Sequence, residues 1–294
     1  MKLGFENVLI LGAYGRLGVQ LSRFLENTHN VIRVGRNKDS AVIIKDFTIK
    51  TIEELLLIYN VKILINLIAA TNVDDCDNYP DEAFLANSII PHYISNAVNR
   101  LDRDVFVLHI STDQVYSGKT LHKEEDINPC NVYGVSKLSG ELFIANSKNV
   151  CILRTNYFGL SHAVNNESYL DWLVSSIIAK RQISVFQNVF FTPVGCRSLC
   201  FMILRLIKKK LLGTYNFGSC RALSKAEFAE IVAKKLGVDN PKFIYSDYVS
   251  NSNIKRPLDM TMESKKLLTE LLFDPIVVED DISYELGDLY SKIK

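Results

Sequence analysis

Short apolar runs alternate with amphipathic stretches through the first half of the chain. The apolar runs have the length of buried strands, and the stretches between them repeat apolar residues at helical spacing. Strands that are apolar along their whole length, with helices between them, indicate a parallel sheet covered on both faces, and therefore an α/β fold with a doubly wound parallel sheet. The predicted strands are Val8–Leu11, Val31–Val34, Ile63–Leu67, Val105–His109 and Val150–Leu153. The predicted helices are Leu17–Asn27, Thr51–Tyr59, Asp81–Asn99 and Val132–Ser147.

This alternation weakens after about residue 155. Aromatic residues and loops with Pro or Gly separate shorter helical stretches, predicted at Tyr169–Lys180, Cys200–Lys209 and Lys225–Leu236. Ser224 precedes the last stretch as a candidate N-cap. We therefore divide the chain into a first domain over residues 1–155 and a smaller, mixed α/β part over residues 156–294. A strand of the second part can return to the main sheet.

Composition narrows the classes of partner. The 294 residues are 48% hydrophobic and 23% charged, enough for a sizeable core. Lys and Arg number 34 against 33 Asp and Glu, and this net charge of +1 argues against nucleic acid or a membrane surface as a partner. The six cysteines have no C-x-x-C spacing, and no nearby histidine completes a zinc set with Cys196 and Cys200. We expect a cytoplasmic protein without a metal, in which His109 is a satisfied core histidine.

Three glycines follow the first predicted strand. Gly12, Gly15 and Gly18 have the spacing G-x-x-G-x-x-G. The first glycine permits a tight turn, the second lets backbone N–H groups approach a pyrophosphate, and the third lets the helix pack closely on the strand. Their place between a strand and a helix at the start of the chain is typical of a dinucleotide-binding (Rossmann) domain.

The end of the second predicted strand indicates which dinucleotide is bound. Arg36 stands there, and no acid follows before Asp39. A guanidinium can bind a 2′-phosphate through two parallel hydrogen bonds, whereas a carboxylate would bind the 2′-hydroxyl of NAD. The sequence thus favours NADP(H) over NAD(H). A solvated loop arginine is the alternative interpretation.

The segment Tyr133–Lys137 has the spacing Y-x-x-x-K, which places both side chains on one face of a predicted helix. An ammonium beside the phenol favours the phenolate and lowers the tyrosine pKa. Upstream, Thr112 ends an apolar strand at the edge where doubly wound sheets bind ligands. Thr112 could donate to a ketone oxygen while Tyr133 protonates it and hydride reaches the carbon. Alternatively Thr112 is a strand-end cap, but its order with the glycine loop, Tyr133 and Lys137 favours chemistry.

Taken together, the motifs resemble the dTDP-4-dehydrorhamnose reductase family of extended short-chain dehydrogenase/reductases. The resemblance implies NADPH-dependent reduction of a 4-keto-6-deoxy nucleotide sugar, in deoxysugar and polysaccharide biosynthesis. A homodimer through the helices predicted at Asp81–Asn99 and Val132–Ser147 is expected by analogy alone. The segments that carry the resemblance are Gly12–Gly18, Asp46–Thr48, Asn66–Asp74, Ser111–Tyr116, Tyr133–Glu141, Leu153–Tyr157 and Arg256–Asp259.

The same resemblance implies roles for individual residues. The catalytic residues would be Thr112, Tyr133 and Lys137, and Lys137 would also hold the nicotinamide ribose. Family members often have an aromatic residue at the position of Gln114 and a Trp at that of Tyr157, which leaves the sugar open. The cofactor-binding residues would be Gly12, Tyr14, Gly15, Arg16, Leu17, Gly18, Arg36, Asp46, Phe47, Ala69, Ala70, Thr71, Tyr133 and Lys137. The substrate-binding residues would be Val73, Thr112, Asp113, Gln114 and Tyr157.

Other reactions of this fold are weighed by the same residues. Related nucleotide-sugar dehydratases use a glutamate as base at the position of Gln114, and an amide cannot abstract a proton. A nucleotide-sugar epimerase, which retains NAD, is disfavoured by Arg36 but stays open. A non-catalytic NADP-binding regulatory subunit also stays open, since the resemblance extends to the regulatory subunit of methionine adenosyltransferase. The complete set of Thr112, Tyr133 and Lys137 favours the reductase.

Overall fold

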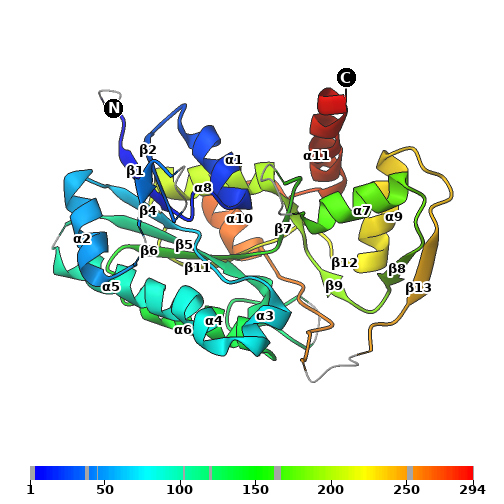
Figure 1. Cartoon of the computed structure of the whole chain (residues 1–294), viewed down its shortest axis with the longest axis horizontal. Helices are drawn as coiled ribbons and strands as arrows, with labels where there is room; N and C mark the ends of the chain where they lie inside the picture. Colours follow the sequence, from blue (N-terminus) through cyan, green and yellow to red (C-terminus); the bar gives the residue numbers. More distant parts are fainter. Residues whose placement is uncertain are drawn as a thin grey trace. The chain divides into compact units, whose positions relative to one another are not determined.

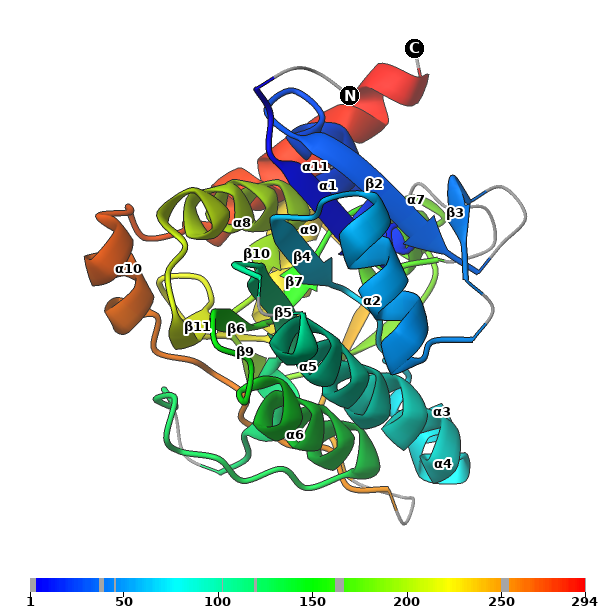
Figure 2. The same cartoon turned by 90° about the vertical axis from the view of Figure 1, so that its left-hand side faces the viewer.

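A seven-stranded sheet in the order β11-β6-β5-β4-β1-β2-β3 combines the strands of residues 7–155 with one strand from the second half of the chain (Figures 1 and 2). The pairs β1–β2, β1–β4, β2–β3 and β4–β5 are parallel. The strand order reverses between β1 and β4, so the doubly wound sheet predicted from the sequence is confirmed. The strands are β1 (Asn7–Leu11), β2 (Asn30–Gly35), β3 (Val42–Ile43), β4 (Ile63–Asn66), β5 (Phe106–Thr112), β6 (Val150–Thr155) and β11 (Gly213–Phe217).

The computed structural model describes residues 4–36, 40–44, 46–101, 103–118, 121–161, 167–249 and 254–293, with side chains as far as residue 287. Within these residues the chain forms two compact units. The first unit comprises residues 1–115, 129–154 and 200–215, and the second comprises residues 116–128, 155–199 and 216–294. Strand β11 therefore comes from the second half of the chain and extends the main sheet beside β6.

Helices cover both faces of the sheet in the first unit (Figures 1 and 2). On one face, Leu9 and Val34 pack in a buried cluster with Ile52, Leu56 and Ile94 from the helices. On the other face, the rings of Phe24 and Phe201 meet edge to face at 4.8 Å. The first face carries α2 (Ile49–Ile58), α5 (Ile90–Arg100) and α6 (Val132–Ile144), and the second carries α1 (Arg16–Leu25) and α8 (Cys196–Lys209).

The helix predicted over residues 81–99 is interrupted. It consists of α4 (Pro80–Phe84), a π-helical turn η1 (Leu85–Ile89) and α5. Upstream lies the short helix α3 (Val73–Asn78), and a 3₁₀ turn η2 (Asp113–Val115) follows β5. The other predicted elements of the first unit are present with ends that differ by a few residues, and β5 continues past its predicted end to Thr112.

The second unit is a mixed α/β arrangement around a separate core. Phe228, Leu173 and Val232 lie at its centre, and none of them is exposed to solvent. Ser224 caps α9 by accepting a hydrogen bond from Glu227 N, as predicted. The helices are α7 (Tyr169–Ile178), α9 (Lys225–Lys235), α10 (Lys265–Leu271) and α11 (Val278–Ile293). Its short strands are β7 (Tyr157–Phe158), β8 (Ile183–Phe186), β9 (Phe190–Phe191), β10 (Val194–Gly195), β12 (Leu223–Ser224) and β13 (Phe243–Ser246), paired β10–β7, β12–β9 and β13–β8.

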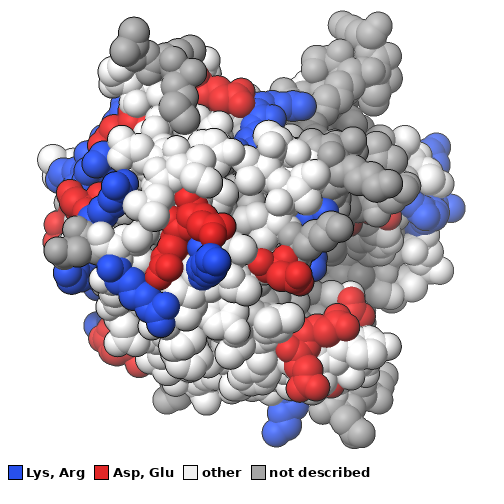
Figure 3. Space-filling model, turned by 60° about the vertical axis from the view of Figure 1, so that its left-hand side comes forward, with Lys and Arg blue, Asp and Glu red and all other residues white. Residues whose placement is uncertain are grey.

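Charged side chains of both signs share the face drawn in Figure 3. Neither sign covers that face alone, in keeping with the net charge of +1. Among the described residues, the helices are too short or too polar to span a membrane.

Candidate active site

The predicted site residues of the first unit follow the carboxyl ends of parallel strands. Leu11 is in register with Val34 on one side and Asn66 on the other, and Asn66 is in register with His109. The carboxyl ends of such strands meet at one edge, which is where doubly wound sheets bind ligands. The segments that the sheet brings to this edge are Gly12–Gly18, Arg36, Ala69–Thr71 and Thr112–Gln114.

The glycine loop has the geometry of an anion site. Gly12 has a φ of +81°, which glycine adopts without strain, and an added Cβ would lie 3.1 Å from Ile68 N. A Cβ on Gly18 would overlap the carbonyl oxygen of Gly12, so only glycine lets α1 approach the loop this closely. Gly15 is the N-cap of α1 and offers no side-chain cap. The first-turn N–H groups therefore point outward at the positive end of the helix, which suits a pyrophosphate.

Tyr14 joins the glycine loop to the segment after β2. Its ring lies against Gly35, where an added Cβ would come within 2.6 Å of Tyr14 Cδ2. Its hydroxyl accepts a hydrogen bond from Ala41 N at 2.6 Å. Arg36, next to Gly35, is exposed and pairs with no acid among the described residues. Asn37–Asp39 lie outside the described residues. An unpaired guanidinium at this point fits the 2′-phosphate of NADP.

Helix α6 starts against the turn that follows β5. The side chain of Asn131 accepts a hydrogen bond from Gly134 N at 2.8 Å and donates to Gln114 Oε1 at 3.1 Å. A Cβ on Gly134 would overlap the carbonyl oxygen of Gln114. This close approach brings the first turn of α6, which carries the buried Tyr133, next to the turn that follows Thr112.

Lys137 lies one turn after Tyr133 and is 2% exposed. Its Nζ donates to the carbonyl oxygen of Ile110 at 2.8 Å. An ammonium has three N–H donors, and among the described residues the other two find no acceptor. Burial lowers the pKa of this ammonium from 10.5 to about 8, with the nearby Glu141 carboxylate acting in the opposite direction. Two free donors on a buried cation suit a pair of ribose hydroxyls.

Thr112 is held in a short hydrogen-bonded turn. Its hydroxyl donates to Asp113 Oδ1 at 3.1 Å and accepts from Gln114 N at 3.2 Å. Both Thr112 and Asp113 are buried, and Gln114 is half-buried. The turn fixes the hydroxyl of Thr112 at the end of β5, at the same edge of the sheet as the glycine loop.

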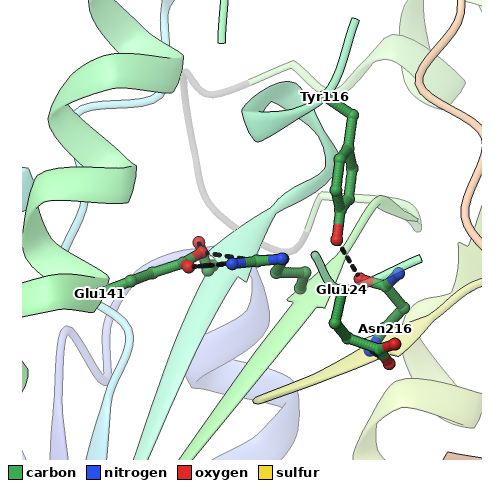
Figure 4. A network of polar contacts seen from close by, with 6 residues as sticks. Tyr116, Glu124, Glu141 and Asn216 are labelled. Carbon is green, nitrogen blue, oxygen red and sulfur yellow. Dashed lines mark hydrogen bonds and ion pairs between the residues drawn. The ribbon is translucent and has the colours of Figure 1, made fainter. Parts of the chain in front are cut away.

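A buried ion pair connects α6 to strand β6 (Figure 4). It was not predicted from the sequence. Arg154 on β6 binds Glu141 through Nε at 3.0 Å and Nη2 at 2.6 Å. Ser111 on β5 also donates to the Glu141 carboxylate. Both charged side chains are 4% exposed. Ser111, Glu141 and Arg154 belong to three different segments that carry the family resemblance, but nothing in the sequence shows that these side chains meet.

Figure 4 also shows a polar network of the second unit. The hydroxyl of Tyr116 donates to Asn216 Oδ1 at 2.7 Å, and Asn216 N donates to Glu124 Oε1 at 2.9 Å. The network fixes the segment 116–128 to the end of β11, where Asn216 lies.

His109 is fully buried between the strands, as expected for a core histidine. Asn66 Nδ2 lies 3.0 Å from its Nδ1, and Asn66 Oδ1 accepts from Ile68 N at 3.1 Å. Burial, followed by the charge of Lys137, holds the pKa of the imidazole well below its usual value. Its Nε2 has no hydrogen-bond partner among the described residues, so only half of the ring is satisfied.

The remaining predicted residues occupy varied places. Val73 is buried in the first turn of α3, and Phe47 packs against the core on the α2 side. Asp46 is exposed before α2, and its carbonyl oxygen accepts from Thr51 at 3.3 Å. Tyr157 belongs to β7 of the second unit, where it pairs with Val194. Across the described chain, no three His, Cys, Asp or Glu side chains gather as a metal site.

Comparison with known proteins gives the family. Residues 6–289 match the RmlD substrate binding domain family. The chain belongs to this family. The resemblance to dTDP-4-dehydrorhamnose reductases expected from the sequence is thereby confirmed. The probable low-salt glycan biosynthesis reductase Agl14 of Haloferax volcanii is 26% identical, over 93% of this chain and 95% of that protein.

Solved structures of this family share the fold. A hypothetical dTDP-4-dehydrorhamnose reductase from Sulfolobus tokodaii is 29% identical, with a TM-score of 0.81 over 94% of this chain and 98% of that one. The dTDP-4-dehydrorhamnose reductase from Bacillus anthracis, solved in complex with NADP, has a TM-score of 0.83 at 23% identity, over 97% and 99% of the two chains.

Proposed function

We propose that this protein is a cytoplasmic, NADPH-dependent reductase of a 4-keto-6-deoxy nucleotide sugar. The observation that carries the proposal is the buried Lys137, one helical turn from Tyr133, with two N–H donors left for a ligand. Family membership and the NADP bound to the Bacillus anthracis relative support the choice of cofactor and substrate class.

The reaction converts a ketone, NADPH and a proton into an alcohol and NADP⁺. Bound NADPH supplies the hydride to the keto carbon. Tyr133 gives its phenolic proton to the ketone oxygen, and the Lys137 ammonium stabilises the phenolate that remains. Thr112 exchanges its hydrogen bond to Asp113 for one to the ketone oxygen, and thereby orients the sugar.

Residues around the cofactor support NADP rather than NAD. The unpaired Arg36 takes the 2′-phosphate, the first turn of α1 takes the pyrophosphate, and Lys137 takes the nicotinamide ribose. The Gln114 side chain accepts a hydrogen bond from Asn131 and has no carboxylate to serve as a base. Dehydration of the sugar is therefore excluded from the proposal, and Gln114 helps to set which ketosugar is accepted.

A panel of freshly prepared 4-keto-6-deoxy nucleotide sugars tests the reaction through NADPH oxidation. Tyr133→Phe is expected to lower kcat at least about a hundredfold, because general acid catalysis contributes that much, and to leave the NADPH Kd within about twofold. Full activity of Tyr133→Phe would contradict the proposal. Tight NADPH binding without turnover on any sugar would instead favour a regulatory subunit of the same fold.

The homodimer is part of the same proposal. Exposed apolar side chains on α6 and η1 would form its interface, namely Val135, Leu142 and Leu85. Sedimentation velocity distinguishes a dimer from a monomer. Leu142→Glu is expected to dissociate the dimer, because a charge would then be buried without a partner.

A further inference from the structure

One buried amide connects the cofactor side of the site to the catalytic helix. Asn87 lies in the π-helical turn η1 and has no exposed surface. A π turn inside a helix is rare and is often found at functional sites. A buried amide is costly unless it is hydrogen-bonded, so its partners show what the residue holds in place.

Both the oxygen and the nitrogen of the Asn87 side-chain amide form hydrogen bonds to the backbone of one residue, Ala70. Its Oδ1 accepts from Ala70 N at 2.9 Å, and its Nδ2 donates to Ala70 O at 3.0 Å. Ala70 lies in the irregular segment after β4, beyond the last in-register residue of that strand. Among the described residues, the N–H and C=O of Ala70 have no partner on a neighbouring strand there. The side chain of Asn87 therefore provides hydrogen bonds that a neighbouring strand would otherwise make.

The same amide also reaches the catalytic helix. Asn87 Nδ2 donates to Ser136 Oγ at 3.0 Å, and Ser136 Oγ donates to the carbonyl oxygen of Tyr133 at 2.9 Å. Ser136 stands directly before Lys137. The two helices touch here at backbone distance, because a Cβ on Gly140 would overlap the carbonyl oxygen of Asn87.

We propose that Asn87 is a positioning residue, which sets the cofactor-lining segment at Ala70 and the Tyr133–Lys137 turn of α6 in one fixed geometry. The π turn is the device that lets a helical residue point its amide at both. This inference rests on the proposed function for the roles of Ala70 and Tyr133. It concerns a residue that the motifs alone do not distinguish from its helical neighbours.

Ser88 provides a matched control. It lies next to Asn87 in the same turn, is equally buried, and donates through Oγ to the carbonyl oxygen of Ser136 at 2.7 Å. Asn87→Ala and Ser88→Ala therefore each remove one buried polar side chain between η1 and α6. Only the Asn87 variant also removes the two hydrogen bonds between Asn87 and Ala70, after which, within the described chain, Ala70 O keeps only the weaker bond from Cys76 Sγ.

The first readout is NADPH affinity, measured by calorimetry on the full chain. Asn87→Ala is expected to weaken binding at least about tenfold, and Ser88→Ala to leave it within about twofold. Asn87→Asp keeps the bond from Ala70 N and loses both donors, so it is expected to weaken binding in the same direction. It serves as the second variant if Asn87→Ala does not fold, as judged by circular dichroism.

The second readout separates the hydrogen bonds of Asn87 to Ala70 from its hydrogen bond to Ser136. Ser136→Ala removes the hydrogen bond between Asn87 and α6 and leaves both hydrogen bonds between Asn87 and Ala70 in place. We therefore expect kcat to fall and the NADPH Kd to stay near that of the wild type. Wild-type NADPH affinity in both Asn87 variants, or equal losses in Ser88→Ala, would overturn the positioning role. A wild type that binds NADPH but reduces no ketosugar would overturn the proposed reaction, while the comparison of NADPH affinities would still decide the role of Asn87.

Discussion

At the scale of single residues, the buried charge of Lys137 lowers the free energy of unfolding. Its ammonium is buried with one hydrogen bond, and its pKa falls from 10.5 to about 8. Between about pH 8 and pH 10.5, Lys137 is therefore protonated in the unfolded chain and largely neutral in the folded one. Stability is reduced in full below pH 8 and is regained as the pH rises through that window.

Lys137→Met is accordingly expected to raise the free energy of unfolding at pH 7 by about 1–3 kcal/mol. The variant removes the destabilisation that lowers the pKa from 10.5 to about 8, and it loses the smaller contribution of the hydrogen bond to Ile110. The same variant should lose turnover. Urea unfolding at pH 7 and pH 10 measures the gain, which should shrink at pH 10 because the folded wild type is then neutral at this position. A destabilised variant at pH 7 would show that the burial of the charge is compensated elsewhere.

The proposed role of Arg36 in cofactor preference is also tested at a single side chain. Arg36→Ala is expected to weaken NADPH binding about tenfold or more and to leave NADH binding unchanged, because hydrogen bonds to a charged phosphate are each worth about 1.5–3 kcal/mol. Calorimetry at fixed ionic strength measures both affinities. Arg33→Ala is the control, since Arg33 lies on β2, just before Arg36 in the chain, but pairs with Glu26. An unchanged preference in Arg36→Ala would remove the guanidinium from the cofactor site.

At the scale of elements, α6 depends on the ion pair beneath it. Arg154→Met leaves the Glu141 carboxylate buried without its partner, and we expect a loss of about 3–5 kcal/mol in the free energy of unfolding. The double variant Arg154→Met/Glu141→Gln removes the uncompensated charge and should recover most of that loss. Urea denaturation compares the three chains. A double variant no more stable than Arg154→Met would show that the pair acts through packing rather than charge.

The predictability of each element follows from its burial pattern. Strands β1 and β4 are buried on both faces, so Val8–Leu11 and Ile63–Ile65 form uninterrupted apolar runs that could be predicted. Strand β3 has two residues, and β11 reads Gly-Thr-Tyr-Asn-Phe, too polar and too short a run to stand out. The π turn at Leu85–Ile89 keeps a helical composition, and only its backbone hydrogen bonding distinguishes it from the α-helices on either side.

At the scale of the whole molecule, the candidate site residues could be predicted from the sequence, whereas the contacts that hold them in place could not. Residues that we propose face the ligand, such as Gly12 and Tyr133, lie in short motifs whose spacing reflects local chemistry. The supporting contacts, such as Asn87 with Ser136 and Ser111 with Glu141, join positions that are 49 and 30 residues apart in the chain. Those pairings depend on how helices dock on the sheet, which the sequence of a single chain does not display.

The way the first unit is assembled predicts how the chain responds to cutting. A fragment of residues 1–155 lacks β11 and the part of α8 that packs on α1. Without them the edge of β6 and one apolar face of the sheet are exposed, so the fragment is expected to aggregate and to bind NADPH weakly if at all. Sedimentation and calorimetry check this, with residues 200–215 added through a flexible linker as the control. A monomeric fragment 1–155 with wild-type affinity would contradict the expectation.

Strand β11 also has a consequence for biosynthesis. The ribosome delivers β1 to β6 in order, but β11, the strand that covers the edge of β6, is translated only after the whole of α8. Until then the nascent chain presents an uncovered strand edge, to which another nascent chain can pair. Synthesis that pauses between residues 155 and 213 prolongs this exposure. The yield of folded protein in the cell should therefore depend on the speed of translation across that interval, more than on the stability of the finished molecule.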